Sequence, residues 1–150
     1  MRTGFFISLG AVFVCDRALK LLCTGRRAVL IPGVLAVRAQ WNTGAAFSLL
    51  AEHPLLISAL TLLCIAGMLI YVLIRPPRPF PAVCLGLITG GALGNALDRL
   101  LYGAVLDWVD LALFPWFVFN LADAAIVIGA ILLGVYILFG AKETDSHGNT

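Results

Sequence analysis

The sequence predicts an all-α membrane protein in which four helices cross the bilayer as a bundle. Two observations predict this class. The 150 residues are 61% hydrophobic and only 12% charged, with a mean hydropathy of +1.02, whereas a soluble domain carries about 25% charged residues. The chain also contains four apolar stretches of roughly the 20 residues that a crossing helix needs. Lipid is therefore the natural solvent for most of the chain.

The four crossings are expected at residues 4–23, 54–74, 80–97 and 117–139. We expect the first to be retained as a helix, because Asp16, Arg17 and Lys20 interrupt the place where a signal-peptide cleavage site would lie. The second contains no charged residue. The third is rich in glycine, which lets neighbouring helices pack closely. Together the four crossings predict one membrane domain over residues 1–141, followed by a polar tail over residues 142–150.

The connections between the crossings are unequal in length. Residues 75–79 form a very short turn on one side of the bilayer, and the long loops 24–53 and 98–116 lie on the other. Arg75 and Arg78 make the short turn densely basic, which favours a cytoplasmic position for it. We therefore expect both termini and the tail to be cytoplasmic and the two long loops to be extracytoplasmic.

The first long loop is expected to contain secondary structure of its own. Residues 34–41 read as a short strand near the membrane surface. The sequence Asn42-Thr43-Gly44 is a turn signal. Residues 45–52 are expected to form a short interfacial helix before Pro54 begins the second crossing.

Polar residues of different segments converge on one side of the bilayer in this arrangement. The first helix leaves the membrane there, the third helix leaves there, the fourth helix enters there, and both long loops lie there. This convergence follows from the number of crossings and does not depend on the absolute orientation. The converging residues are Asp16, Lys20, Asn42, Asn95, Asp98, Arg99, Asp107, Asn120 and Asp123.

Two of the converging acids are the candidates for catalysis. Asp123 lies six residues past the expected start of the fourth helix, about 9 Å below the interface at a rise of about 1.5 Å per residue, where an unpaired charge is costly. Asp107 lies in an apolar segment that we expect to press against the membrane surface. Two carboxylates in one partly dry site share a single proton. Aspartic proteases use such a pair to activate water and to protonate a carbonyl oxygen.

The other converging residues have structural interpretations as well. Asp16 and Lys20 are four residues apart, so they form either a self-neutralising pair on one helix face or a brace for the acids. Asp98 and Arg99 can form a structural pair at the end of the third helix. Asn120 can hold helices together through hydrogen bonds or can act in the site.

Other chemistries are disfavoured by the composition. Cys15, Cys23, Cys64 and Cys84 form no CxxC pair, and with two histidines in the chain a zinc site is not expected. No serine or cysteine has a matching histidine for a nucleophilic triad. The net charge of +2 and the lack of a basic run argue against a nucleic-acid partner.

Five sequence blocks, taken in order, resemble the lipoprotein signal peptidase family, also called signal peptidase II. They are DRALK at 16–20, NTGAAFS at 42–48, GGALGNALDR at 90–99, GAVLDW at 103–108 and FNLADAAI at 119–126. The resemblance implies an aspartic endopeptidase with the catalytic pair Asp107 and Asp123. It implies supporting or substrate-binding roles for Asp16, Lys20, Asn42, Asn95, Asp98, Arg99 and Asn120.

The resemblance also implies a fold, a substrate and a location. The fold would combine the four-helix bundle with a small extracytoplasmic β-cradle and a short interfacial helix. The substrate would be a diacylglyceryl-modified bacterial prolipoprotein, cleaved on the N-terminal side of the lipid-modified cysteine in the bacterial inner membrane. The resemblance implies no metal or organic cofactor, and we expect membrane lipids but no obligate protein partner around the enzyme.

Two other classes of function remain open at the level of the sequence. A small proton-coupled transporter or channel would also place acids inside a membrane, although a conduit should carry polar groups through the full thickness of the bilayer. A non-catalytic membrane scaffold would tolerate loss of both acids without losing its function in cells.

Overall fold

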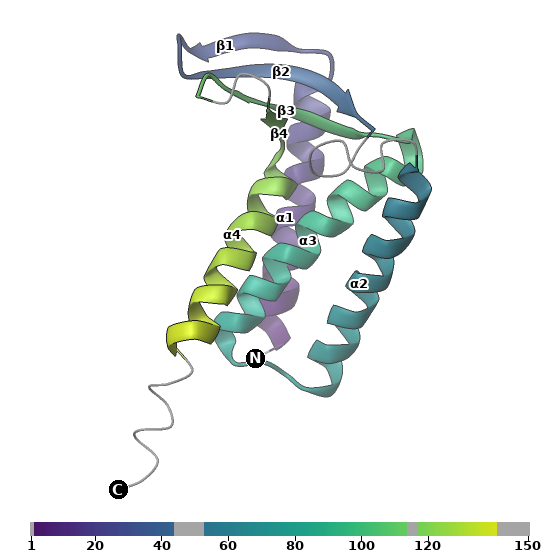
Figure 1. The fold of residues 1–150 in the computed structure, drawn as a ribbon, viewed down its shortest axis with the longest axis vertical. Coiled ribbons are helices and arrows are strands. Elements are labelled where there is room, and N and C mark those ends of the chain that lie inside the picture. The colour runs from purple at the N-terminus through teal and green to yellow at the C-terminus, as the bar shows by residue number, and fades with distance from the viewer. Residues whose placement is uncertain (1, 44–52, 114–116, 141–150) are drawn as a thin grey trace, which may run out of the picture.

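The computed structural model describes residues 2–43, 53–113 and 117–140, which form four long helices with a small sheet across one end (Figure 1). The helices are α1 (Arg2–Cys23), α2 (Pro54–Ile74), α3 (Pro79–Tyr102) and α4 (Leu121–Val135), and α4 continues into the π-helical turn η2 (Tyr136–Gly140). The start of α1, the α2–α3 connection and the end of α4 lie at the end of the bundle opposite the sheet (Figure 1). The predicted tail at 142–150 and the predicted helix at 45–52 lie outside the described residues.

Three of the described helices are long and apolar enough to cross a membrane: α2, α3 and α4 with η2. α2 has the bounds that were expected for the second crossing. α1 is also long, with 22 residues, but it carries Asp16, Arg17 and Lys20 near its end. Large apolar side chains cover the outside of the helices, for example Leu63 at 71% exposure and Ile74 at 71%, as expected for surfaces that face lipid.

Two predicted helix boundaries were wrong, each for a local reason. The third helix was expected to end at residue 97 but continues to Tyr102, because Asp98 is neutralised by basic residues of α1. It ends at Gly103, whose φ of 70° is the left-handed conformation that commonly terminates helices. The fourth helix was expected from residue 117 but begins at Leu121, because Val118 and Phe119 form a strand and Asn120 caps the helix.

Helix α3 is the centre of the bundle and packs against α1, α2 and α4. Its small residues allow this close approach. A side chain at Gly86 would collide with the backbone of α1 at Phe5, and one at Gly91 would collide with the α4 carbonyl oxygen of Ala122. The predicted role of the glycine-rich segment in close helix packing is confirmed by these contacts.

The sheet has four antiparallel strands in the order β1 (Arg27–Ile31), β2 (Leu35–Asn42), β3 (Val105–Leu111) and β4 (Val118–Phe119). The predicted strand at 34–41 is confirmed as β2, shifted by one residue. The other three strands were not predicted from the sequence. The segment around Asp107, expected to press against the membrane surface, is the strand β3. Its pairing with β2 places Gln40 opposite Asp107 and Asn42 opposite Val105.

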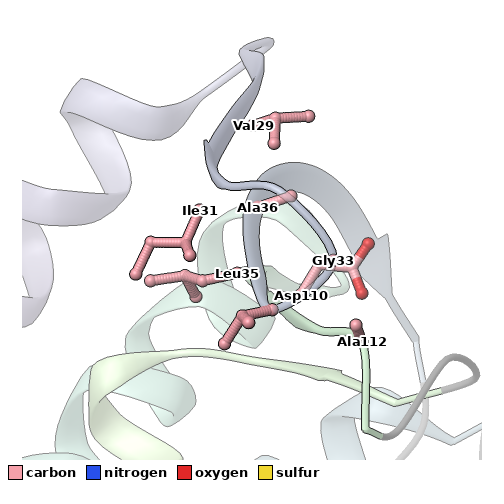
Figure 2. A pocket seen from close by; sticks show the side chains of 8 residues that line it. Val29, Ile31, Gly33, Leu35, Ala36, Asp110 and Ala112 are labelled. Carbon is pink, nitrogen blue, oxygen red and sulfur yellow. The ribbon is translucent and has the colours of Figure 1, made fainter.

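The sheet also encloses a small hollow that is separate from the converging acids. This hollow has a volume of about 130 Å³ and lies between the β1–β2 hairpin and the end of β3 (Figure 2). Apolar side chains line most of it, including Val29, Ile31 and Leu35, together with the carboxylate of Asp110. None of the predicted site residues lines this hollow, so it is not the candidate site.

Candidate active site

The polar residues predicted to converge do meet, at the end of the bundle where the sheet covers the helices. Three helices and two strands contribute to this cluster. α1 supplies Asp16 and Lys20, β2 supplies Asn42, α3 supplies Asn95, Asp98 and Arg99, β3 supplies Asp107, and the start of α4 supplies Asn120 and Asp123.

Asp107 is almost fully buried, with 2% of its surface exposed. Two asparagine side chains hold its carboxylate. The Nδ2 group of Asn120 donates to Oδ1 at 2.7 Å, and the Nδ2 group of Asn42 donates to Oδ2 at 3.0 Å. Both carboxylate oxygens are thus fixed by donors from elements on either side, α4 and β2.

Burial raises the pKa of Asp107 to about 6, from an ordinary value of 3.8, because a buried charge loses its solvation. The neighbouring carboxylate of Asp123 raises this pKa further, while the hydrogen bonds from Asn42 and Asn120 and the charge of Lys20 lower it. Repulsion between Asp107 and Asp123 is the behaviour expected of two acids in one site. Near neutral pH, such a pair can exchange a proton at little cost.

Asp123 lies at the first turn of α4 and forms a reciprocal cap with Asn120. The Oδ1 atom of Asn120 accepts from the backbone N–H of Asp123 at 2.9 Å, and Oδ2 of Asp123 accepts from the backbone N–H of Asn120 at 3.2 Å. This capping box fixes both side chains relative to the start of the helix. Asp123 lies two residues past the start of α4, whereas the expected start of the helix placed it six residues inside.

Asn95 of α3 joins the two acids to the rest of the cluster. Its Nδ2 group donates to Oδ1 of Asp123 at 2.7 Å, and its Oδ1 accepts from Nδ2 of Asn120 at 3.2 Å. Arg99 is one turn further along α3, and its charge interacts with Asp107 and Asp123. α3 therefore contributes both a hydrogen-bond donor and a cation to the site.

A buried group of four charges lies beside the acids and consists of Asp16, Arg17, Lys20 and Asp98. Lys20 Nζ lies 3.0 Å from Asp16 Oδ2 and 2.8 Å from Asp98 Oδ2, and Arg17 contacts the same two carboxylates at 2.8 Å and 2.5 Å. Both sequence interpretations of Asp16 and Lys20 therefore hold, since they pair with each other and also reach other elements. Asp98 pairs with both basic residues of α1 and also interacts with the charge of its neighbour Arg99.

The two carboxylates of this group also support the elements that carry the acids. Oδ1 of Asp16 accepts from the backbone N–H of Ala122 at 3.1 Å, beside Asp123, and Oδ2 of Asp98 accepts from the backbone N–H of Leu106 at 3.2 Å, beside Asp107. Arg17 was not assigned a role from the sequence. A cation next to Asp16 in an apolar helix, where an unpaired charge is costly, was the signal that could have identified it.

The arrangement suits proton transfer between carboxyl groups. Each acid accepts hydrogen bonds from N–H donors, which is how a protein holds a carboxylate without a metal ion. Within residues 2–43, 53–113 and 117–140, no group of three or more histidine, cysteine, aspartate or glutamate side chains is arranged to hold a metal ion.

Comparisons with known proteins agree with one another. Residues 8–139 match the profile of the family described as signal peptidase (SPase) II. A lipoprotein signal peptidase of Pelotomaculum thermopropionicum is 43% identical over 146 residues, which cover 93% of this chain and 95% of the relative. One of Methylorubrum extorquens is 40% identical, covering 99% of this chain and 94% of the relative.

The fold also resembles a solved structure. The match is described as a bacterial membrane enzyme determined by the in meso method at 2.3 Å resolution. It has a TM-score of 0.83 at 27% identity and covers 97% of this chain and 92% of the other. The similarity therefore extends over both the helices and the sheet.

Proposed function

The chain belongs to the signal peptidase II family, and from this membership we propose that Asp107 and Asp123 are its catalytic pair. It is a peptidase of the bacterial inner membrane that removes the signal peptide from prolipoproteins. The observation that carries the assignment is the convergence of two carboxylates from β3 and α4, bridged by Asn95 and Asn120, at one end of an apolar bundle.

In the proposed mechanism, the two acids share one proton. The ionised member takes a proton from a bound water, and the resulting hydroxide attacks the scissile carbonyl carbon. The protonated member gives its proton to the carbonyl oxygen, which yields a tetrahedral diol without a covalent acyl-enzyme. When the diol collapses, the C–N bond breaks and the departing amine takes a proton from the acid that activated the water. The other acid takes a proton from a diol hydroxyl, which forms the new carboxyl group and restores the starting proton on the pair.

The neighbouring residues have distinct roles in this proposal. Asn42 and Asn120 donate to the two oxygens of Asp107 and hold its carboxylate in place. Arg99 places positive charge near both acids and limits their mutual repulsion. Asp16, Lys20 and Asp98 keep the start of α4 and the strand β3 in place.

The position of the site suits a substrate that remains in the membrane. We propose that α1 also crosses the membrane, in addition to α2, α3 and α4, since its charges near Lys20 are neutralised within the bundle. A prolipoprotein with a diacylglyceryl-modified cysteine would keep its acyl chains in lipid beside the exposed apolar faces of the helices. Its peptide bond on the N-terminal side of that cysteine would then lie at the depth of Asp107 and Asp123.

The direct test is cleavage of a diacylglyceryl-modified prolipoprotein by the purified protein. Asp107→Asn and Asp123→Asn should each lower kcat by more than about 10³-fold, because each removes a proton donor or acceptor of the reaction. Asp110→Asn, on the same strand as Asp107, is the matched control and should retain activity. Full activity in either catalytic variant would remove that acid from the mechanism.

A second arm of the experiment tests the proposed chemistry itself. Incubation with a chelator such as EDTA should leave the cleavage rate unchanged, since the proposed steps use carboxyl groups alone. Loss of activity with the chelator, and its recovery on adding a divalent metal, would instead indicate a metal-dependent peptidase.

The alternative of a proton-coupled transporter is not favoured. The charged side chains of the described helices gather at the sheet end of the bundle, apart from Arg2 at the opposite end, where Arg75 and Arg78 lie in the α2–α3 connection. Buried polar side chains deeper in the bundle include Ser58 and Thr89, whose hydroxyls donate to carbonyl oxygens of their own helices. A proton path across the membrane would need polar groups that are continuous between the two ends.

A further inference from the structure

Lys20 makes three hydrogen bonds, and one of them reaches a residue that contacts a catalytic acid. Its Nζ donates to Asn95 Oδ1 at 2.9 Å, in addition to its ion pairs with Asp16 and Asp98. A lysine ammonium has three donors and no acceptor, so these three oxygens saturate it. The side chain is 4% exposed, so water competes little for these bonds.

The ammonium group of Lys20 favours one orientation of the Asn95 side-chain amide. Asn95 presents Oδ1 to Lys20 and Nδ2 to Asp123. In the reversed orientation, the NH₂ group would face the ammonium, donor against donor, and the carbonyl oxygen would face the Asp123 carboxylate, acceptor against acceptor. Because Lys20 can only donate, it stabilises the orientation in which Asn95 donates to Asp123.

The side-chain amide of Asn120 is also held in one orientation, but by a backbone N–H group. The backbone N–H of Asp123 donates to Asn120 Oδ1 at 2.9 Å, which directs the Nδ2 group of Asn120 to Asp107. One asparagine is thus oriented by a helix N-terminus. The other is oriented by Lys20, at 2.9 Å, together with the longer bond from Asn120 Nδ2 at 3.2 Å. Each of the two acids receives an amide donor for this reason.

We infer that Lys20 is a positioning residue that acts through Asn95: its ammonium holds the Asn95 amide in the orientation that donates to Asp123. The inference rests on the proposed catalytic roles of Asp107 and Asp123. It assigns Lys20 a function in the reaction that is separate from neutralising Asp16 and Asp98.

Arg17 makes a control for this inference possible. It pairs with the same two carboxylates as Lys20, Asp16 and Asp98, whereas the bond to Asn95 Oδ1 comes from Lys20. Arg17→Gln therefore removes a cation from the same cluster while leaving the Lys20–Asn95 bond. It should lower the unfolding temperature and keep kcat within about threefold of wild type.

The test is a double-mutant cycle with the full chain in lipid nanodiscs and a diacylglyceryl-modified prolipoprotein as substrate. Lys20→Met and Asn95→Ala should each lower kcat by about 10- to 100-fold, the range for losing one hydrogen bond to a charged group, with little change in KM. In the Asn95→Ala background, Lys20→Met should lower kcat by less than about threefold further. Effects that multiply would overturn the inference, because Lys20 would then act independently of Asn95.

A charge-balanced variant covers the case in which Lys20→Met does not fold. Lys20→Met combined with Asp16→Asn leaves one carboxylate, Asp98, with one cation, Arg17, and the new amide oxygen can still accept from Ala122. This variant should show the same fall in kcat. A folded charge-balanced variant with wild-type kcat would refute the role of Lys20. Activity retained by Asp123→Asn would instead refute the proposed catalytic pair, so the two failures are distinguishable.

Discussion

At the scale of single residues, Asp107 combines deep burial with a charge that the proposed reaction needs. Its pKa is raised to about 6 by burial and by Asp123. Between about pH 4 and pH 6, the native protein therefore binds a proton at this position that the unfolded chain does not. The free energy of unfolding falls as the pH rises through this window and remains lower above it.

We accordingly expect Asp107→Asn to become more stable relative to wild type as the pH increases. The pH-dependent part of the stability difference between the two proteins should be about half of its limit at pH 5 and should reach that limit, about 3 kcal/mol for a shift of this size, by pH 8. Thermal unfolding in detergent, followed by tryptophan fluorescence, measures this difference. A gap that stays constant from pH 5 to pH 8 would contradict the prediction. Asp110→Asn is the control for removing a carboxylate from the same strand.

The identity of the converging residues could be predicted from the sequence, but their hydrogen bonds could not. Four expected crossings place the loop that contains Asp107 and the start of the helix that contains Asp123 on the same side of the bilayer. The bond between Lys20 and Asn95 joins residues 75 positions apart and depends on how α1 is rotated against α3. Sequence spacing carries no information on that rotation, so the orientation of Asn95 required the structure.

At the scale of elements, the close packing of α3 against α4 determines how the acids are placed. Gly91 of α3 lies against the backbone of Ala122, and a Cβ there would lie 2.9 Å from Ile126 Cγ1. Ala122 directly precedes Asp123. A wider spacing between the two helices would therefore pull Asp123 away from its donor on α3, Asn95.

Gly91→Ala is expected to lower both stability and activity. Overpacking of this kind costs about 1–3 kcal/mol, and the displaced Asp123 should reduce kcat by about 10-fold or more, since small misplacements have large effects on catalysis. Gly67→Ala in α2 is the matched control, because a Cβ there meets nothing within 4 Å. Unfolding temperature and kcat of both variants test this, and equal behaviour of the two would contradict the proposed role of the spacing.

The boundaries of the elements show where prediction from sequence ended. α2 was predicted at both ends, because its charge-free apolar run leaves no ambiguity. The extension of α3 to Tyr102 depends on Arg17 and Lys20 reaching Asp98 from another helix, which a reading of α3 alone does not include. β1 and β3 were missed because short strands at a membrane surface lack a clear alternation, and β4 has two residues.

At the scale of the whole molecule, the strands join the helices at one end of the bundle. α1 leads into β1, α3 leads into β3, and β4 leads into α4 (Figure 1). The short connection between α2 and α3 lies at the other end and carries Arg75 and Arg78. We propose that the sheet end is extracytoplasmic, since dense positive charge favours the cytoplasmic side.

Thiol labelling of spheroplasts tests this orientation. In a background where the four native cysteines are replaced by alanine, Val34→Cys at the β1–β2 turn should react with a membrane-impermeant maleimide. Pro76→Cys, in the α2–α3 connection, should react only after the membrane is permeabilised. Both positions are exposed in the structure. The reverse labelling pattern would place the active site on the cytoplasmic side.

The capping box at the start of α4 has a consequence for the cost of catalysis. The atoms that orient Asp123 and Asn120 belong to the N-terminus of the helix, so their side-chain rotamers become fixed when α4 forms. The entropy lost in aligning these groups is therefore lost during folding and not at each encounter with a prolipoprotein. The site is preorganised before a substrate arrives, and the binding energy of the lipid-modified segment remains for placing the scissile bond.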